Sequence, residues 1–378
     1  MPHPFGLQIE KTLKAIKYIS LKMFVELNKM NQNIKNFFSE KRYRWWLMAS
    51  IIVIYLIIVA GAIVRMTGSG MGCPDWPKCF GYWIPPTEQV EIEFSPETPY
   101  KEGMVIIVDE ELRVAKKDFF TGTSYQPQNW EAYTKHDYSV FNVYHTWTEY
   151  INRLIGALGG LVVFIMFLFS LRYIKKRPRL TILSFVSVLS MGIQAVIGKI
   201  VVDTNLSPAL ITFHMIAALL IVGLLIYLLH EVKPTDYRYK SNKTMVRAIA
   251  GLIILTLIQV VMGTQVRQFI DEQVDVFGYP LSSEWLENGP LIFLIHRSYS
   301  TLLLVLHGWF IYKAVLIFHH PKKAYSVLAS LFVITILSGV FMNYLDFPFG
   351  SQAVHLVVAS LILGMQFYLW MRLRVALK

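Results

Sequence analysis

Eight long apolar segments limit what this chain can fold into. They cover approximately residues 43–65, 142–172, 179–203, 207–230, 244–268, 289–316, 323–344 and 349–372. Each reaches the ~20 residues that a helix needs to cross the hydrocarbon core of a bilayer. The chain is 54% hydrophobic and only 16% charged, whereas soluble domains carry about 25% charged residues. We therefore predict an all-α integral membrane protein with eight transmembrane helices, and we exclude a soluble enzyme, a disordered protein and a disulfide-rich secreted scaffold.

The connecting segments alternate in charge from one side to the other. The segments on one side, both termini included, hold 25 Lys/Arg and 5 Asp/Glu, whereas those on the other side hold 6 Lys/Arg and 19 Asp/Glu. The positive-inside rule places both termini in the cytoplasm. The net charge of +11 is thereby explained by membrane topology rather than by nucleic acid binding.

An internal repeat divides the chain into two halves. Similar stretches end spans one and five, similar pairs lie in spans two and six, and a Gly precedes a His by sixteen residues in spans three to four and again in spans seven to eight. The matches are Gly61–Arg65 with Gly263–Arg267, Asn152-Arg153 with His296-Arg297, and Gly198/His214 with Gly339/His355. An even number of spans in each repeat gives both halves the same orientation. We therefore expect two pseudo-symmetric four-helix bundles related by an axis along the membrane normal.

The repeat defines the expected domains. Residues 1–42 form a basic amphipathic cytoplasmic segment on the membrane surface. Residues 43–230 form the N-terminal half, with a large outer loop at 66–141 that we expect to fold partly as strands. Residues 231–378 form the C-terminal half.

Three histidines lie inside spans at about the same depth, five to seven residues from the outer ends. They are His214, His296 and His355. Ionisable side chains in spans are rare and usually face the bundle interior. Two histidines at equal depth on facing helices suit six-coordinate heme, whereas the alternative is that each one hydrogen-bonds a neighbouring helix. The repeat relation between His214 and His355 favours heme. For His307, deeper on span six, a packed and hydrogen-bonded role is expected.

Together these residues resemble the heme A synthase family of membrane enzymes. The most specific part runs from Gly61 to Cys79, GAIVRMTGSGMGCPDWPKC, and is followed by Gly81 and Pro85-Pro86. Glu149 and Arg153 in span two, His214, the His296-Arg297 pair and His355 complete the pattern. The resemblance covers about residues 43–372, except much of 86–138.

The resemblance implies oxidation of a methyl group of heme O to a formyl group, through an alcohol and a gem-diol, to give heme A for terminal oxidase assembly. The C-terminal half would hold a b-type heme, heme b, on His296 and His355, and the N-terminal half would hold heme O near His214. Heme O synthase and an electron acceptor such as quinone are candidate partners, in a bacterial cytoplasmic membrane. The arginines near the outer side would meet heme propionates, with snorkelling as the alternative; they are Arg65, Arg153, Arg267 and Arg297.

The chain departs from the family pattern in span two, where Asn152 replaces a histidine. His145 is the nearest substitute, but it lies two turns earlier and ~10 Å closer to the outer surface. We therefore predict that His214 is the only strong iron ligand of the first half and that Asn152 contributes at most a hydrogen bond. Direct replacement by His145 is the alternative.

Glu149 is a carboxylate inside a span, one turn from Asn152. It is predicted to accept a proton or to stabilise a cationic intermediate, and its alternative role is to pair with Arg153 or His145. Cys73 and Cys79 lie on the outer, oxidising side, where a disulfide is expected. Its role, structural or redox-active, stays open.

Two other functions compete with the synthase. A b-type membrane cytochrome that carries electrons to or from quinone would need His296 and His355, but neither the first-span signature nor Glu149. A transporter would suit the repeat, but it predicts discontinuous helices at the middle of the membrane.

Overall fold

The computed structural model describes residues 22–23, 39–136, 138, 140–232 and 241–376. In this part of the chain, eight helices are long and apolar enough to cross a membrane, which confirms the predicted fold class. They are α2 (Glu40–Met66), α3 (Val143–Ser170), α4 (Pro178–Asp203), α5 (Pro208–Val232), α6 (Lys243–Phe277), α7 (Leu291–Tyr312), α8 (Lys322–Tyr344) and α9 (Ser351–Val375). Of the segment predicted at 1–42, most lies outside the described residues.

Polar side chains and prolines mark where several helices begin. Ser39, Asn142 and Asn242 cap the first turns of α2, α3 and α6 by accepting backbone N–H groups. Proline occupies the first position of α4 and of α5, where its missing N–H would have no helical partner. These local signals agree with the predicted boundaries.

The outer end of α6 differs from the prediction. The fifth span was expected to end near residue 268, but α6 continues to Phe277. The added residues include three acidic side chains but neither Gly nor Pro, so nothing in them breaks a helix. The helix ends at Gly278, whose φ of 71° lies in the left-handed region that glycine tolerates. A 3₁₀ segment at Tyr279–Leu286 then leads to α7.

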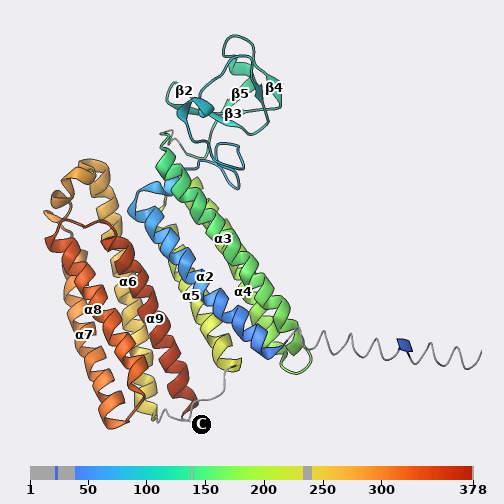
Figure 1. Cartoon of the computed structure of the whole chain (residues 1–378). Coiled ribbons are helices and arrows are strands. Elements are labelled where there is room, and N and C mark those ends of the chain that lie inside the picture. The colour runs from blue at the N-terminus through green and yellow to red at the C-terminus, as the bar shows by residue number, and fades with distance from the viewer. Residues whose placement is uncertain (1–21, 24–38, 137, 139, 233–240, 377–378) are drawn as a thin grey trace, which may run out of the picture.

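The helices pack in two neighbouring groups of four (Figure 1). Helices α2 to α5 contact one another around an apolar cluster that includes Leu47, Met166 and Leu225. Helices α6 to α9 enclose a second cluster that includes Ile249 and Phe310. The axis predicted to relate the two halves stays a prediction.

Helix α9 joins the two groups by contacting α2 and α5. The Tyr55 hydroxyl of α2 donates to the Ser360 carbonyl of α9 at 3.4 Å. At Gly364, one turn further along α9, a Cβ atom would collide with the Tyr55 hydroxyl. The absent side chain at Gly364 therefore lets α9 approach the first group closely.

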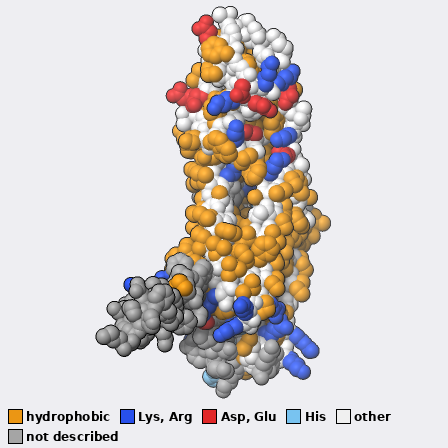
Figure 2. Space-filling view, turned by 90° about the vertical axis from the view of Figure 1, so that its right-hand side faces the viewer, with side chains coloured by type: hydrophobic (Ala, Val, Ile, Leu, Met, Phe, Trp, Pro, Cys, Tyr) orange, Lys and Arg blue, Asp and Glu red, His pale blue; other side chains and the backbone are white. Residues whose placement is uncertain are grey.

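The surface of the bundle matches a membrane environment. Figure 2 shows apolar side chains around the middle of the molecule, with acidic side chains near one end and mostly Lys and Arg at the other. Large apolar side chains such as Ile52, Leu220 and Val305 are more than half exposed on the helices. In lipid, such exposure carries no hydrophobic penalty. The protein is thus an integral, multi-pass membrane protein.

The outer segment between α2 and α3 forms two small antiparallel sheets. Strand β1 (Pro99–Tyr100) pairs with β4 (Phe119–Phe120), and a second sheet has the order β2 (Val105–Val108), β3 (Glu111–Ala115), β5 (Trp130–Ala132). Asp109 and Glu110 connect β2 to β3 with φ of 52° and 61°, as a two-residue hairpin turn requires. Tyr100, Ile106, Ala115 and Trp130 make a small core between the strands.

Candidate functional site

A buried disulfide organises the loop that follows α2. Cys73 and Cys79 are bonded, as predicted, and both are fully buried. The loop packs directly on α3. There is no room for a side chain at Gly72, where a Cβ atom would meet the backbone of His145. The Thr146 hydroxyl also donates to the Gly72 carbonyl at 2.8 Å. The glycine of the first-span signature therefore permits close contact between loop and helix.

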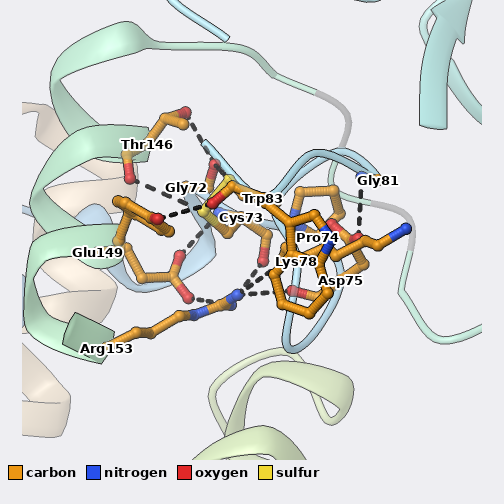
Figure 3. Close-up of a disulfide and its surroundings, with 12 residues drawn as sticks. Gly72, Cys73, Pro74, Asp75, Lys78, Gly81, Trp83, Thr146, Glu149 and Arg153 are labelled. Atoms are coloured by element: carbon orange, nitrogen blue, oxygen red, sulfur yellow. Dashed lines mark hydrogen bonds and ion pairs between the residues drawn. A yellow bond between two sulfur atoms is a disulfide. The ribbon is translucent and has the colours of Figure 1, made fainter. Parts of the chain in front are cut away.

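Glu149 and Arg153 bind this loop from α3 (Figure 3). One carboxylate oxygen of Glu149 accepts the Cys73 N–H at 2.7 Å, and the other pairs with Arg153 at 2.6 Å. The side chain of Glu149 is only 5% exposed. Of the two pairings weighed for Glu149, the structure contains the one with Arg153, and the buried carboxylate is balanced by a cation and an N–H group.

The Arg153 side chain crosslinks the disulfide loop by donating hydrogen bonds to backbone carbonyls of that loop. Its guanidinium donates to the carbonyls of Asp75 at 2.6 Å, Lys78 at 2.9 Å and Cys73 at 3.1 Å. Asp75 in turn accepts the Gly81 N–H at 2.9 Å. Burial raises the pKa of Asp75, while the Gly81 hydrogen bond and the Arg153 charge oppose that rise. Arg153 is therefore engaged with the loop, and its predicted contact with a heme propionate stays a prediction.

The other outer arginines have different surroundings. Arg65 of α2 and Arg267 of α6 both bind Asp271 of α6, with N–O distances of 3.0 Å and 2.7 Å. Arg267 also donates to the Arg65 carbonyl at 2.8 Å. One carboxylate thus joins two arginines that correspond in the sequence repeat. Arg297 is exposed, and its guanidinium lies 5.8 Å from the Phe293 ring centre.

Each of the three span histidines faces a glycine of a neighbouring helix. The Cβ position of Gly263 lies 3.1 Å from Cε1 of His296, that of Gly339 lies 3.5 Å from His355, and that of Gly198 lies 3.7 Å from His214. A side chain at these glycines would crowd the imidazole rings. Gly61 corresponds to Gly263 in the repeat, but a Cβ there would meet nothing within 4 Å.

His296 and His355 lie close together between α7 and α9. Their ring centres are 6.3 Å apart and the ring planes are tilted by 58°. Nδ1 of His355 lies 2.9 Å from the Ser338 hydroxyl and 3.0 Å from the Thr335 carbonyl. Because a carbonyl only accepts, the tautomer that bonds Thr335 carries its proton on Nδ1 and its lone pair on Nε2. Nδ1 of His296 is buried without a hydrogen-bond partner among the described residues.

In the first half, Asn152 and His145 lie two turns apart on α3. Asn152 is half-buried, whereas the backbone of His145 lies under Gly72 of the disulfide loop. His145 is thus on the loop side of Asn152, as the helix spacing predicted. Within the described residues, no three His, Cys, Asp or Glu side chains cluster as metal ligands.

Comparison with known proteins identifies the family. A family model described as "Cytochrome oxidase assembly protein", COX15-CtaA, matches residues 44–125 and 121–367. The chain belongs to the COX15-CtaA family.

Curated relatives of this COX15-CtaA protein extend over nearly the whole chain. A protein named Heme A synthase from Wolbachia pipientis wMel is 24% identical over 376 residues, which cover 91% of this chain and 96% of the relative. Another Heme A synthase, from Bartonella quintana (strain Toulouse), is 24% identical over 88% of this chain and 92% of its own. The similarity therefore includes both groups of helices.

Three polar residues of this COX15-CtaA protein were missed by the sequence analysis. Asp271 bridges the two arginines, and Gln194 and Gln259 donate to the backbone carbonyls of His214 and His296 at 3.1 Å and 2.9 Å. Each glutamine precedes by four residues the glycine that faces its histidine. This four-residue spacing between glutamine and glycine is the sequence signal from which the two glutamines could have been found.

His307 has the packed role that was expected for it. It is 1% exposed, its Nδ1 donates to the Leu303 carbonyl at 2.7 Å, and its Nε2 lies 2.6 Å from the Gln366 amide nitrogen. Gln366 also donates to the Thr256 hydroxyl at 2.8 Å. These bonds join α6, α7 and α9 within the apolar interior.

Replacement of Asp271 by Asn is expected to destabilise the contact between the two groups of helices. The substitution leaves Arg65 and Arg267 close together without their shared anion. Because Asp271 is partly exposed, we expect a loss of about 1–2 kcal/mol rather than the larger loss of a fully buried pair. Thermal unfolding in detergent measures it, and Asp275→Asn, an exposed carboxylate one turn further along α6, is the control. Equal melting temperatures for both variants would contradict the bridging role.

Proposed function

We propose that this protein is a heme A synthase, which oxidises a methyl group of heme O to a formyl group and so produces heme A. The observation that carries this proposal is the similarity along nearly the full length to proteins named Heme A synthase. The family described as cytochrome oxidase assembly protein agrees with it. Both groups of helices and the disulfide loop lie within the matched residues.

We assign heme b to the C-terminal half, with His296 and His355 as its ligands. An iron held by both imidazoles would have two iron–nitrogen bonds of about 2 Å, and each ligating nitrogen lies about 1 Å from the centre of its ring. The sum of these lengths is close to the 6.3 Å that separates the two ring centres. The Thr335 carbonyl holds Nδ1 of His355 and leaves Nε2 as the ligating nitrogen. Gly263 and Gly339 leave room beside the two imidazoles. The residues present therefore fit a bis-histidine heme.

When bound by His296 and His355, heme b would supply one-electron transfer. The protein's own contribution is to hold both imidazoles at a fixed separation in a dry interior. Arg267 is the nearby cation for a propionate, because its Nη1 is buried without a partner in the described part of the chain. Arg297 is the second cation assigned to this half.

The substrate heme O belongs in the N-terminal half, with His214 as its strong ligand. Asn152 is half-buried, and a carboxamide binds iron poorly. Arg65 and Arg153 are the cations of this half, and each is already held by protein acceptors. A site with one strong ligand retains its heme less firmly than a bis-histidine site. Weaker retention suits a pocket that must release its product.

Glu149 is proposed as the proton acceptor, or as the anion that stabilises positive charge in the oxidation. Conversion of a methyl group to a formyl group removes hydrogen from carbon, so protons must leave the site. The carboxylate lies one turn above Asn152 and is shielded from water. Its bonds to Cys73 and Arg153 also give it a structural role, which the experiment on Glu149 below separates from proton transfer.

The membrane setting follows from charge and family. We propose that residues 43–230 and 231–378 act as the substrate half and the electron-transfer half, with both termini in the bacterial cytoplasm. Heme O synthase as donor of the substrate and a quinone as electron acceptor are the proposed partners. A b-type cytochrome without porphyrin chemistry would not need the loop that Glu149 and Arg153 bind. The described spans also lack the helix breaks at mid-membrane that a transporter would require.

Pigment extraction from purified protein tests the activity and the heme b assignment. We expect heme b together with heme O or heme A in the unmodified protein. His296→Ala or His355→Ala should abolish the low-spin heme b spectrum, because each removes an axial ligand. Heme b alone would favour the electron carrier. A low-spin spectrum that survives in both variants would refute the ligand assignment.

Substitutions in the first half test the single-ligand site. We expect His214→Ala to cause a severe loss of heme O binding and of heme A yield, while Asn152→Ala and His145→Ala have mild effects. Binding should also weaken on acidification, because histidine ligates iron only when neutral. The measurement is extracted heme content per protein. If His145→Ala is as damaging as His214→Ala while heme b stays intact, then His145 is the displaced ligand.

Glu149→Gln tests proton transfer against loop anchoring. The amide still accepts the Cys73 N–H, so we expect the disulfide to stay inaccessible to thiol reagents and heme b to stay unchanged, while heme A formation is lost. Thiol labelling with and without prior reduction, heme spectra and heme A yield are measured together. Labelling of Cys73 or Cys79 after a mild reduction that leaves the disulfide of the unmodified protein intact would show instead that Glu149 acts by holding the loop.

A further inference from the structure

Two glutamine side chains hold the helix backbone at two of the proposed heme ligands. Gln259 of α6 donates to the carbonyl of His296, and Gln194 of α4 donates to the carbonyl of His214, with distances of 2.9 Å and 3.1 Å. A helical carbonyl has a second lone pair, so it can accept this extra bond beside its helical one. Each bond connects a neighbouring helix to the turn that carries a histidine.

The same neighbouring helix contacts the imidazole ring as well. Gly263 lies one turn after Gln259, Gly198 lies one turn after Gln194, and each glycine faces the ring of the same histidine. Residues four apart lie on one face of a helix. A Gln-x-x-x-Gly unit thus contacts each histidine twice, once at the backbone and once at the ring.

At the third histidine, Thr335 takes the place of glutamine. It lies one turn before Gly339, and its carbonyl accepts Nδ1–H of His355 at 3.0 Å. The bond runs to the ring instead of to the backbone. His355 is therefore held by the Thr335 backbone carbonyl and the Ser338 hydroxyl, and the glutamine contact is made to His214 and His296.

At the fourth site of the repeat, formed by α2 and α3, both the glutamine and the histidine are missing. Ile57 lies four residues before Gly61, where the repeat would place a glutamine, and Asn152 stands where it would place a histidine. The end of the Ile57 side chain lies instead against Gly159, two turns further along α3. If the glutamines served only general helix packing, position 57 would need one as well. Position 57 thus lacks the glutamine at a site where the histidine is also missing, whereas both glutamines that are present bond the backbone of a histidine.

The buried polar atoms without hydrogen-bond partners in the two glutamine–histidine pairs support the same conclusion. Oε1 of Gln194 and Oε1 of Gln259 are buried without hydrogen-bond partners in the described part of the chain, and so is Nδ1 of His214 and of His296. Each glutamine–histidine pair thus contains one unsatisfied acceptor and one unsatisfied ring nitrogen. Histidine ligands of metals usually give their second ring nitrogen to such an acceptor.

We infer that Gln259 and Gln194 are positioning residues for the iron ligands His296 and His214. The inference rests on the proposed heme sites and extends them. It also makes the substrate site one-sided. His214 has its glutamine, whereas the corresponding place on α3 has Asn152 instead of a histidine, and α2 has Ile57 instead of a glutamine.

Gln259→Met in the full-length protein tests the inference. Methionine keeps the length of the side chain and removes the hydrogen bond. We expect about tenfold weaker retention of heme b, as for other residues that orient metal ligands, together with an altered low-spin EPR signal and midpoint potential. Gln268→Met is the matched control, because Gln268 lies on the same helix and donates to Glu272 at the surface. Unchanged retention, EPR signal and potential in Gln259→Met would overturn the inference.

A gain-of-ligand experiment gives an independent second test. Asn152→His introduces the missing imidazole, and Ile57→Gln introduces its proposed partner. We expect the double variant to hold more low-spin heme per protein than Asn152→His alone. Equal low-spin heme in the two would count against a positioning role for the glutamine.

Failure of this inference is distinguishable from failure of the proposed activity. If the unmodified protein shows low-spin heme but forms no heme A, the synthase proposal fails, whereas the effect of Gln259→Met on the spectrum remains measurable. If heme A forms but Gln259→Met behaves as Gln268→Met does, the positioning role alone is refuted.

Discussion

The absence of water inside a bilayer is the constraint on which the whole structure depends. A polar group within the hydrocarbon region must find a partner inside the protein. Glu149 therefore binds a cation and a backbone N–H, and Gln366 binds both His307 and Thr256. Each of these residues crosslinks two or more elements because no solvent competes for it. The positions of polar residues in the spans thus determine where the helices are fastened to one another.

Most of the fastenings with ionic character lie near the outer ends of the helices. Arg153 joins α3 to the disulfide loop, and Asp271 joins α2 to α6 through two arginines. Toward the opposite end, the two groups of helices are held by apolar clusters and by the close approach at Gly364. These ionic contacts therefore lie around the level of the proposed hemes and make the structure rigid there. At the opposite end, the Arg177–Glu231 ion pair accompanies the packing between helices.

The sequence predicted the elements whose signals are local. Span length and charge alternation identified all eight helices, and the position of the cysteines predicted their disulfide. The predicted end of α6 was wrong. The acidic residues after residue 268 were assigned to a loop, although the added part of the helix contains no helix-breaking residue before Gly278. Asp271 and the two glutamines were missed for another reason. Each has a partner on another helix, and only the packed structure shows that Arg65 and Arg267 share one carboxylate.

The hydrogen bonds at the base of the outer sheets have a consequence for how this protein family can vary. The Tyr133 hydroxyl binds the Pro74 carbonyl, and the Tyr150 hydroxyl binds the Trp83 carbonyl. The chain therefore leaves for the strands and returns from them at one place beside α3. A surface excursion with neighbouring ends can lengthen or shorten at little entropic cost. The far end of the β-structure can thus change in length, whereas Val105 of β2 and Leu112 of β3 stay packed in one apolar cluster with the disulfide.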